Sequence, residues 1–460
     1  MDFVMSVRAL RASPAGSAGA PHSPWRHVAQ AAAALAAGMG VGRFVYTPIL
    51  PLMHAGAGLS AADGANLATA NYIGYLLGAL VGILAPAVVR SRALLRTSLV
   101  VLTGTLAAMP ATHDTAVWFA LRLLAGVASA LIFVIAVSSL LSHLREYPAH
   151  LPGWAFGGVG AGIALSGLLV LLLRPVADWR TAWWASAALA AVLSAASWKL
   201  RPETPPTTPQ AIQAAEATQV TQAAEATQAA EAIQADQAAR ATTVTAAAVD
   251  DSRGPRTHRW FTALFASYTL EGIGYIIAGT FLVAAIEQSS PGPLGGGAWV
   301  LVGLAAVPSS ALWARLGRRW SRPDLLLAAL VVQAVGIALP ALIGGAPAAL
   351  VSAVLFGATF IGVSTLALAT GAHLEFPRSV ALLTAGYSVG QILGPLVVAP
   401  LLHHGYQQAL ILAASVVLVA AVAAAVLRIG FPHHMVVVRA TAPVRQPAPT
   451  ESAADAGSRR

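Results

Sequence analysis

The chain has 460 residues, of which 57% are hydrophobic and only 10% are charged, and its mean hydropathy is +0.71. Soluble domains carry about 25% charged residues, so this composition excludes a soluble protein and indicates an integral membrane protein. The net charge of +9 does not indicate nucleic-acid binding, because the arginines lie in short connections between apolar runs, where orientation signals are found. The absence of cysteine excludes disulfides and thiolate metal sites.

The N-terminal segment 1–26 is basic but lacks a clean apolar core, and we interpret it as a cytoplasmic tail. The apolar run that follows is longer than the core of a signal peptide, so it is predicted to be a retained membrane span. About 20 apolar residues suffice to cross a bilayer, and the chain divides into such runs. The first six spans are expected near 27–50, 65–89, 93–111, 115–142, 152–173 and 181–199.

A polar segment, rich in Ala, Gln and Glu, then interrupts the apolar runs and contains QAAEATQ twice, at 213–219 and 222–228. It has no apolar stripe to bury, which predicts a polar linker with transient helicity; a regulatory docking segment is the alternative. Six further spans are expected near 259–286, 296–315, 323–343, 347–371, 379–402 and 406–428. The predicted domains are the tail (1–26), a six-helix bundle (27–199), the linker (200–257), a second six-helix bundle (258–428) and a C-terminal tail (429–460).

The placement of the arginines predicts the orientation of this all-α polytopic protein. If the N-terminus lies inside, the opposite side of the membrane receives only Arg174 and Arg180, as the positive-inside rule requires. Both termini and the linker are then cytoplasmic.

Two segments indicate an internal repeat. GVGRFVYTPIL (Gly40–Leu50) and GIGYIIAGTFL (Gly272–Leu282) place Gly-x-Gly at the same offset within the first span of each predicted bundle. With six spans on each side of the linker, this suggests two parallel halves with a substrate site between them near the membrane midplane.

Twelve spans in two halves joined by a long linker resemble the major facilitator superfamily. RLGRR (Arg315–Arg319) is similar to the second-half copy of the cytoplasmic loop motif of that superfamily, although Ala314 stands at the usual acidic position; Arg315, Gly317 and Arg318 are the matching residues. The first-half copy, LAPAVVRSR (Leu84–Arg92), lacks the Asp and Gly.

Other segments extend the resemblance. LRLLAGVASA (Leu121–Ala130) is similar to the Arg–Gly motif of the fourth span, and GYSVGQILGP (Gly386–Pro395) to the Gly-rich helix at the interface of the halves. GMGVGRFVYTPILPLM (Gly38–Met53) with ANYIGYLLGAL (Ala70–Leu80) resembles, more narrowly, the YbfB/YjiJ family of bacterial transporters, whose substrates are poorly defined. The resemblance implies a bacterial inner-membrane protein in which spans 1, 4, 7 and 10 line a central cavity.

Three charged residues lie well inside predicted spans: Arg43, Arg122 and Glu271. Intramembrane charges normally face a cavity or a partner, because lipid cannot solvate them. Arg43 and Arg122 are suited to clamp a carboxylate or phosphate; alternatively, Arg43 pairs with helix-end carbonyls or with Glu271 and locks the halves together. The resemblance also implies a role of Arg122 in proton coupling. Glu271 is the candidate proton carrier, with a permanent ion pair to a first-half arginine as the alternative.

Hydroxyl and amide groups inside the spans complete the candidate substrate site, although each alone is more often a packing residue. The substrate-binding candidates are Arg43, Tyr46, Asn71, Tyr75, Tyr275, Tyr387 and Gln391; Tyr72 and Tyr268 share their character. His373, Glu375 and Arg378 are interpreted as a solvated cluster at the cytoplasmic gate. The pairs His403–His404 and His433–His434 lack further ligands at metal spacing, so no metal or cofactor is predicted.

These observations favour a secondary active transporter for a small polar or anionic solute, with protons as the expected coupling partner, a surrounding lipid bilayer and a monomeric state. No nucleotide-binding loop is visible, which argues against ATP drive. A transporter-derived sensor is one alternative. A membrane-embedded enzyme is the other, but no Ser–His pair or His/Asp/Glu cluster lies at membrane depth, so no catalytic activity is predicted.

Overall fold

The computed structural model describes residues 24–85, 90–143, 151–201, 257–317, 319–374, 376 and 379–431. The first part contains α1 (Pro24–Leu35), the π-helix η1 (Ala36–Val41), α2 (Tyr46–Ala57), α3 (Ala61–Leu84), α5 (Arg92–Ala108), the 3-10 helix η2 (Met109–Ala111), α6 (Thr115–His143), α7 (Leu151–Leu173) and α8 (Trp179–Ser197). The second contains α10 (Thr257–Ser289), α11 (Leu294–Leu316), α12 (Arg322–Leu342), α13 (Gly345–His373), α14 (Ser379–Val398), the 3-10 helix η3 (Ala399–His404) and α15 (Tyr406–Leu427).

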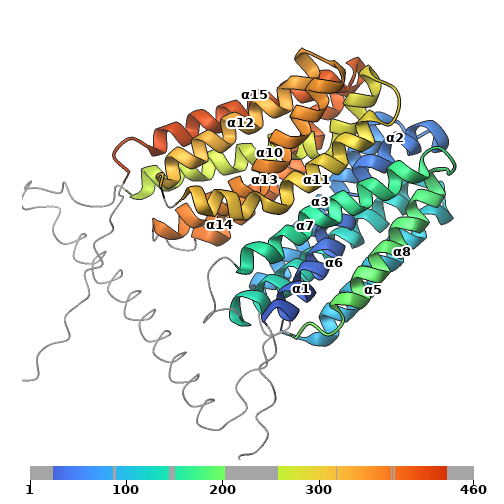
Figure 1. The fold of residues 1–460 in the computed structure, drawn as a ribbon, viewed down its shortest axis with the longest axis horizontal. Helices are drawn as coiled ribbons and strands as arrows, with labels where there is room; N and C mark the ends of the chain where they lie inside the picture. The colour runs from blue at the N-terminus through green and yellow to red at the C-terminus, as the bar shows by residue number, and fades with distance from the viewer. Residues whose placement is uncertain are drawn as a thin grey trace, which may run out of the picture.

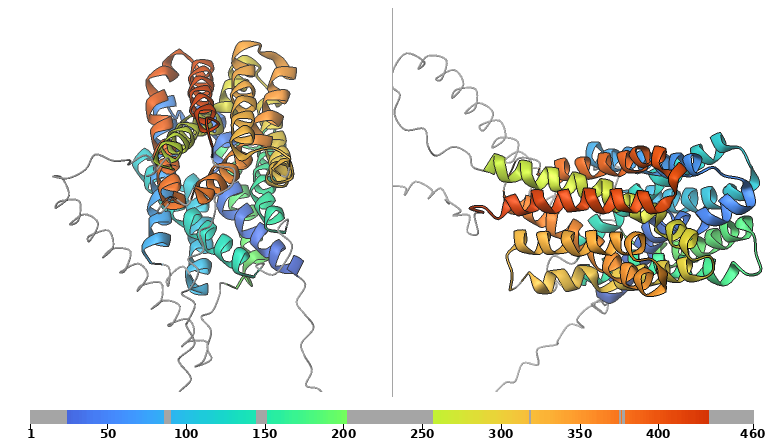
Figure 2. Two further views of the ribbon diagram at one scale, coloured as in Figure 1. Left: turned by 90° about the vertical axis from the view of Figure 1, so that its left-hand side faces the viewer. Right: turned by 90° about the horizontal axis from the view of Figure 1, so that it is seen from above.

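Within these ranges every regular element is helical, and ten helical stretches are long and apolar enough to cross a membrane. The predicted all-α polytopic class is therefore confirmed. The predicted spans near 65–89 and 181–199 form the helices α3 and α8, which are not among those ten. The helices run side by side along a common direction, with those before the linker gathered on one side and those after it on the other (Figures 1 and 2).

The starts of several helices follow from short polar residues before the apolar runs. Ser60, Ser91, Asp178 and Ser321 precede α3, α5, α8 and α12, and the side chain of each accepts a hydrogen bond from the backbone N–H three residues onward. Such caps satisfy N–H groups that have no partner within the helix. The hydrogen bonds from Thr181 also lower the pKa of Asp178, which lies outside the spanning segments.

The first predicted span is not one continuous helix. It runs as α1 and the π-helix η1, is interrupted by a turn at 42–45, and resumes as α2. Pro48, in the first turn of α2, has no N–H to donate to the carbonyl of Phe44, which accepts instead from the N–H of Thr47 at 3.2 Å. A Cβ on Gly40 would lie 2.5 Å from Cα of Gly162, so this glycine lets η1 touch the backbone of α7.

Among the described residues, the main contacts between helices from the two sides of the linker are those of α7 with α11, α3 with α14 and α2 with α10, and smaller contacts join α3 to η3 and α2 to α11. Glycines on both surfaces allow the first of these contacts, because a Cβ on Gly160 of α7 would lie 2.6 Å from the carbonyl oxygen of Gly303 of α11. Small residues let spanning helices approach closely, as the glycine-rich sequence of α7 suggests. The interrupted first span therefore contacts α10 through α2, while α14 packs on α3.

Candidate functional site

The side chain of Arg122, in α6, contacts the turn at 42–45 that interrupts the first span. Its Nη1 and Nη2 atoms donate to the backbone carbonyls of Gly42 and Arg43 at 3.3 and 3.4 Å, and its guanidinium carbon lies 4.7 Å from the ring centre of Tyr46. Both carbonyls belong to the turn between η1 and α2, where the helical hydrogen-bond pattern is broken. Arg122 therefore fixes the backbone that carries Arg43.

Two of the predicted substrate-binding residues donate hydrogen bonds to backbone carbonyls of α6 and α3. Asn71 of α3 donates from Nδ2 to the carbonyl of Arg122 at 3.0 Å. The hydroxyl of Tyr46 donates to the carbonyl of Gly64 at 2.9 Å. Both side chains are buried, and Oδ1 of Asn71 has no hydrogen-bond partner among the described residues, so their role in substrate binding stays a prediction.

The side chain of Arg43 lies at a contact between the two parts of the chain and is only 3% exposed. Its Nη2 atom donates to Oε1 of Gln391 in α14 at 3.1 Å. Its guanidinium carbon lies 4.2, 5.2 and 5.5 Å from the ring centres of Tyr75, Tyr72 and Phe44. Nε has no hydrogen-bond partner among the described residues. The charge is thus stabilised mainly by aromatic faces and one neutral amide, which leaves donor capacity for a further group.

Aromatic rings of the second part of the chain extend from this arginine toward Glu271. The rings of Tyr268 and Tyr387 stack at 4.4 Å, and Tyr275 lies 6.0 Å from Tyr387 and 5.4 Å from Phe360. The sequence had marked the tyrosines but not Phe360. The ring of Phe360 lies 6.2 Å from that of Phe44, which is one of the rings around Arg43, so the two aromatic groups are continuous.

Glu271 of α10 is fully buried, and its partner is an amide. Its Oε1 atom accepts a hydrogen bond from Nε2 of Gln333 in α12 at 3.2 Å, while Oε2 has no partner among the described residues. The alternative of a permanent ion pair between Glu271 and an arginine is therefore not what the structure shows. Sequence reasoning missed Gln333, although an amide within the apolar run 325–342 was a usable signal.

Two hydrogen bonds join the first span and α3 to α10 beside the site. The hydroxyl of Thr47 donates to the carbonyl of Gly279 at 2.6 Å, and the hydroxyls of Tyr72 and Thr280 lie 2.9 Å apart. Thr47 and Gly279 are 232 residues apart, the same offset as that between Gly40 and Gly272 in the two Gly-x-Gly segments. The sequence repeat is thus matched by a direct contact between equivalent positions.

Further polar contacts between the two parts lie at the end of the helices where α2, α7 and α10 finish. Arg174 forms a two-pronged ion pair with Glu287, at 2.5 and 2.9 Å, and also donates to the carbonyl of Gly292 at 2.6 Å. The hydroxyl of Tyr406 lies 2.7 Å from Nε2 of His54. This end of the molecule is therefore tied together across the linker.

At the opposite end, several polar contacts among the described residues join helices on the same side of the linker. Arg428 and Asp324 form an ion pair at 2.5 Å between α12 and the end of α15. Ser139 of α6 lies 3.1 Å from His27 of α1 and donates to the carbonyl of Arg201 at 2.6 Å.

Comparison with known proteins agrees with this fold. A family model described as an uncharacterised MFS-type transporter YbfB, where MFS denotes the major facilitator superfamily, matches the chain twice, at residues 35–235 and 229–425. The chain belongs to this family. A crystal structure of a mutant of the nucleoside transporter NupG is similar in fold, with a TM-score of 0.60 and 13% sequence identity over 87% of this chain and 99% of that chain. None of the curated proteins compared with the chain matches it.

In this YbfB-type MFS chain, the predicted loop motif lies away from the buried cluster. Arg315 and Gly317 are exposed at the end of α11, and Arg318 falls outside the described residues. Glu375 and Arg378 of the expected gate cluster also fall outside them, whereas His373 ends α13. The roles of these residues stay predictions.

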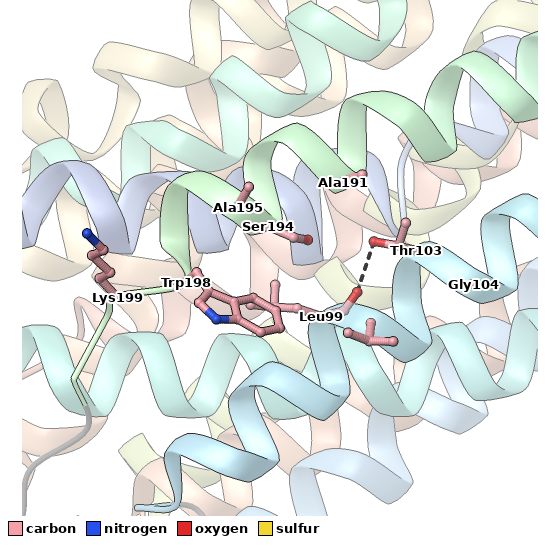
Figure 3. A pocket seen from close by; sticks show the side chains of 9 residues that line it. Leu99, Thr103, Gly104, Ala191, Ser194, Ala195, Trp198 and Lys199 are labelled. Atoms are coloured by element: carbon pink, nitrogen blue, oxygen red, sulfur yellow. Dashed lines mark hydrogen bonds between the residues drawn. The ribbon is translucent and has the colours of Figure 1, made fainter.

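The MFS chain also has a groove that contains none of the predicted site residues. It has a volume of about 700 Å³ and lies between α5 and α8 (Figure 3). Its lining is mainly apolar and partly exposed, whereas Arg43, Arg122 and Glu271 are buried among other helices. The groove and the buried cluster are therefore separate features.

Proposed function

We propose that the protein is a secondary active transporter that moves a small polar or anionic solute across the bacterial inner membrane by alternating access. Twelve spanning helices would form two six-helix bundles, one on each side of the linker, in a monomer whose termini are both cytoplasmic. The observation that carries the proposal is the hydrogen bond between Arg43 and Gln391. Arg43 is a buried cation with an unused hydrogen-bond donor, and this bond joins the first span to α14.

The surroundings of Arg43 favour an anionic or strongly polar ligand group. A guanidinium presents several donors in one plane and binds carboxylates and phosphates in a two-pronged geometry. Gln391 is a neutral acceptor, so a carboxylate or phosphate that replaces it gains a stronger, charge-assisted hydrogen bond. The rings of Tyr75 and Tyr275 would then flank the rest of the solute, which suits a ligand with a flat or apolar part.

Glu271 is the proposed proton carrier. A buried carboxyl group without a cationic partner is stable only when neutral, and the amide of Gln333 is compatible with either protonation state of the acid. Arg122 is instead proposed to support the site, because its contacts are with backbone carbonyls and the ring of Tyr46. Proton binding at Glu271 would thus accompany substrate binding one helical turn away, near Tyr275.

Alternating access is supported by the contacts between the two parts of the chain. The Thr47–Gly279 hydrogen bond joins equivalent positions of the repeat, as expected close to an axis that relates two halves. In the proposed orientation, the Arg174–Glu287 and His54–Tyr406 contacts would close the outer end. Opening the outer end requires that these contacts break.

The proposal is tested by uptake and efflux of a panel of solutes in proteoliposomes under an imposed pH gradient. The panel contains carboxylates, phosphorylated compounds, amino acids and, because of the fold shared with NupG, nucleosides. We expect gradient-driven accumulation of at least one unmodified solute by the wild type, and its loss in Arg43→Ala. Chemical conversion of a solute, or the absence of protein-dependent flux across a broad panel, would contradict the proposal.

A further inference from the structure

Small residues line the groove between α5 and α8 and leave space in it. Gly104 of α5 has no heavy atom within 4 Å of the position where a Cβ would stand, and Ala191 and Ala195 of α8 face it with single methyl groups. Val100, also in the lining, is 57% exposed. The groove therefore opens on the outer face of the bundle, where a spanning helix meets lipid.

One end of the groove is cationic. Lys199 lies there beyond the ring of Trp198 (Figure 3). The guanidinium carbon of Arg96 lies 5.2 Å from the centre of the same ring, and its Nε and Nη2 atoms donate to the carbonyl of Trp198 at 3.4 and 3.5 Å. Tryptophan with basic residues at a helix end is typical of the level of the lipid headgroups. Both cations are exposed, so they remain available to an anion.

A buried polar group inside the groove also lacks a partner. Ser194 of α8 is 6% exposed, and its hydroxyl has no hydrogen-bond partner among the described residues. It points across the groove toward Thr103 of α5, whose own hydroxyl donates to the carbonyl of Leu99 at 2.9 Å (Figure 3). Buried hydroxyls are normally hydrogen-bonded, and this one is left with a donor for a ligand acceptor at this depth.

We propose that the groove binds one anionic phospholipid of the cytoplasmic leaflet. Its phosphate would lie between Arg96 and Lys199, one acyl chain would fill the space beside Gly104, and an ester carbonyl oxygen would accept from Ser194. Basic pockets between spanning helices bind anionic headgroups, and each cation near such a surface contributes roughly a fivefold gain in affinity. This site is independent of the solute site around Arg43.

The test is native mass spectrometry of the full-length protein in detergent, titrated with phosphatidylglycerol or with phosphatidylcholine that has identical acyl chains. We expect one tightly bound phosphatidylglycerol, held at least about fivefold more tightly than phosphatidylcholine. The double variant Arg96→Gln/Lys199→Gln should lose this preference. Gly104→Phe, whose ring would occupy the open space, should weaken the binding of both lipids.

The matched control is Arg259→Gln. Arg259 likewise lies beside a tryptophan ring, at 5.1 Å from Trp260, and donates to a backbone carbonyl, that of Ile429, at 2.9 Å, but it is not part of this groove. This variant should bind phosphatidylglycerol as the wild type does. Equal binding of the two lipids by the wild type, an equal loss in Arg259→Gln, or a self-associated chain that Gly104→Phe dissociates would overturn the proposal.

Discussion

The guanidinium of Arg43 donates a 3.1 Å hydrogen bond to the side-chain oxygen of Gln391, a residue 348 positions further along the chain. This contact links the interrupted first span to α14. The arginine is buried and its remaining neighbours are mostly aromatic rings, so in the proposed solute site an oxygen of the solute would take the place of the Gln391 oxygen. Substitutions at Gln391 and Arg43 can therefore test this site, because one can supply a competing carboxylate and the other can remove the cation.

Gln391→Glu places a carboxylate of nearly the same shape on Arg43. Charge-assisted hydrogen bonds are about twice as strong as neutral ones, so this internal carboxylate should compete with an anionic solute and weaken its apparent affinity about tenfold or more. The measurement is solute exchange at equilibrium in proteoliposomes. Gln391→Leu is the control, because it removes the acceptor without adding a competitor and should weaken binding less. Equal behaviour of the two variants would contradict this role.

Glu271→Gln should abolish proton-driven accumulation of the solute and leave its exchange across the membrane intact. The new amide keeps the size of the side chain and can still accept from Gln333, but it cannot carry a proton. We expect solute exchange between two equal pools to continue, whereas accumulation driven by a pH gradient is lost. Gln333→Leu leaves the acid in place and should retain some gradient-driven accumulation. Full accumulation by Glu271→Gln would exclude it as the carrier.

Arg122→Met should destabilise the protein as well as impair transport. It leaves the carbonyls of Gly42 and Arg43 without their donor, and each unsatisfied buried group costs about 1–3 kcal/mol. The midpoint of thermal unfolding in detergent should fall, and Arg122→Lys should recover part of the loss. Arg180→Gln, at an exposed position, serves as the control. An unchanged midpoint with abolished proton coupling would instead support the role in coupling that the superfamily resemblance implies.

Breaking the ion pair between Arg174 and Glu287 should favour opening of the outer end. Since the natural chain has no cysteine, Thr280→Cys provides a single reporter beside Tyr72 in the contact between α3 and α10. Glu287→Gln should increase its reaction with a membrane-impermeant thiol reagent applied outside. The charge exchange Arg174→Glu/Glu287→Arg should restore protection. Equal labelling of all three proteins would show that the ion pair does not hold this end closed.

The sequence identified the residues whose burial in a membrane costs the most free energy. Arg43, Arg122 and Glu271 were identified because charges are rare at membrane depth, and the structure places all three in the buried interior. The helical class followed from apolar runs of spanning length. These are local properties that do not depend on which helices become neighbours.

The sequence did not predict in the same way which groups these side chains would contact. One alternative from the sequence gave helix-end carbonyls to Arg43, whereas in the structure Arg122 makes such contacts, because the turn at 42–45 lies against α6. Gln333 was missed because its importance depends on the packing of α12 beside α10. The groove between α5 and α8 was missed because it arises from small residues on two helices that are far apart in the sequence.

The most direct test concerns Arg43 itself. Once a transported solute is identified, its affinity is measured by equilibrium exchange for the wild type, Arg43→Lys and Arg43→Gln. We expect Arg43→Gln to lose binding by about a hundredfold or more, and Arg43→Lys to recover only part of it, because lysine keeps the charge but not the two-pronged donor geometry. An unchanged affinity in Arg43→Gln would contradict the assignment of the solute site to this residue.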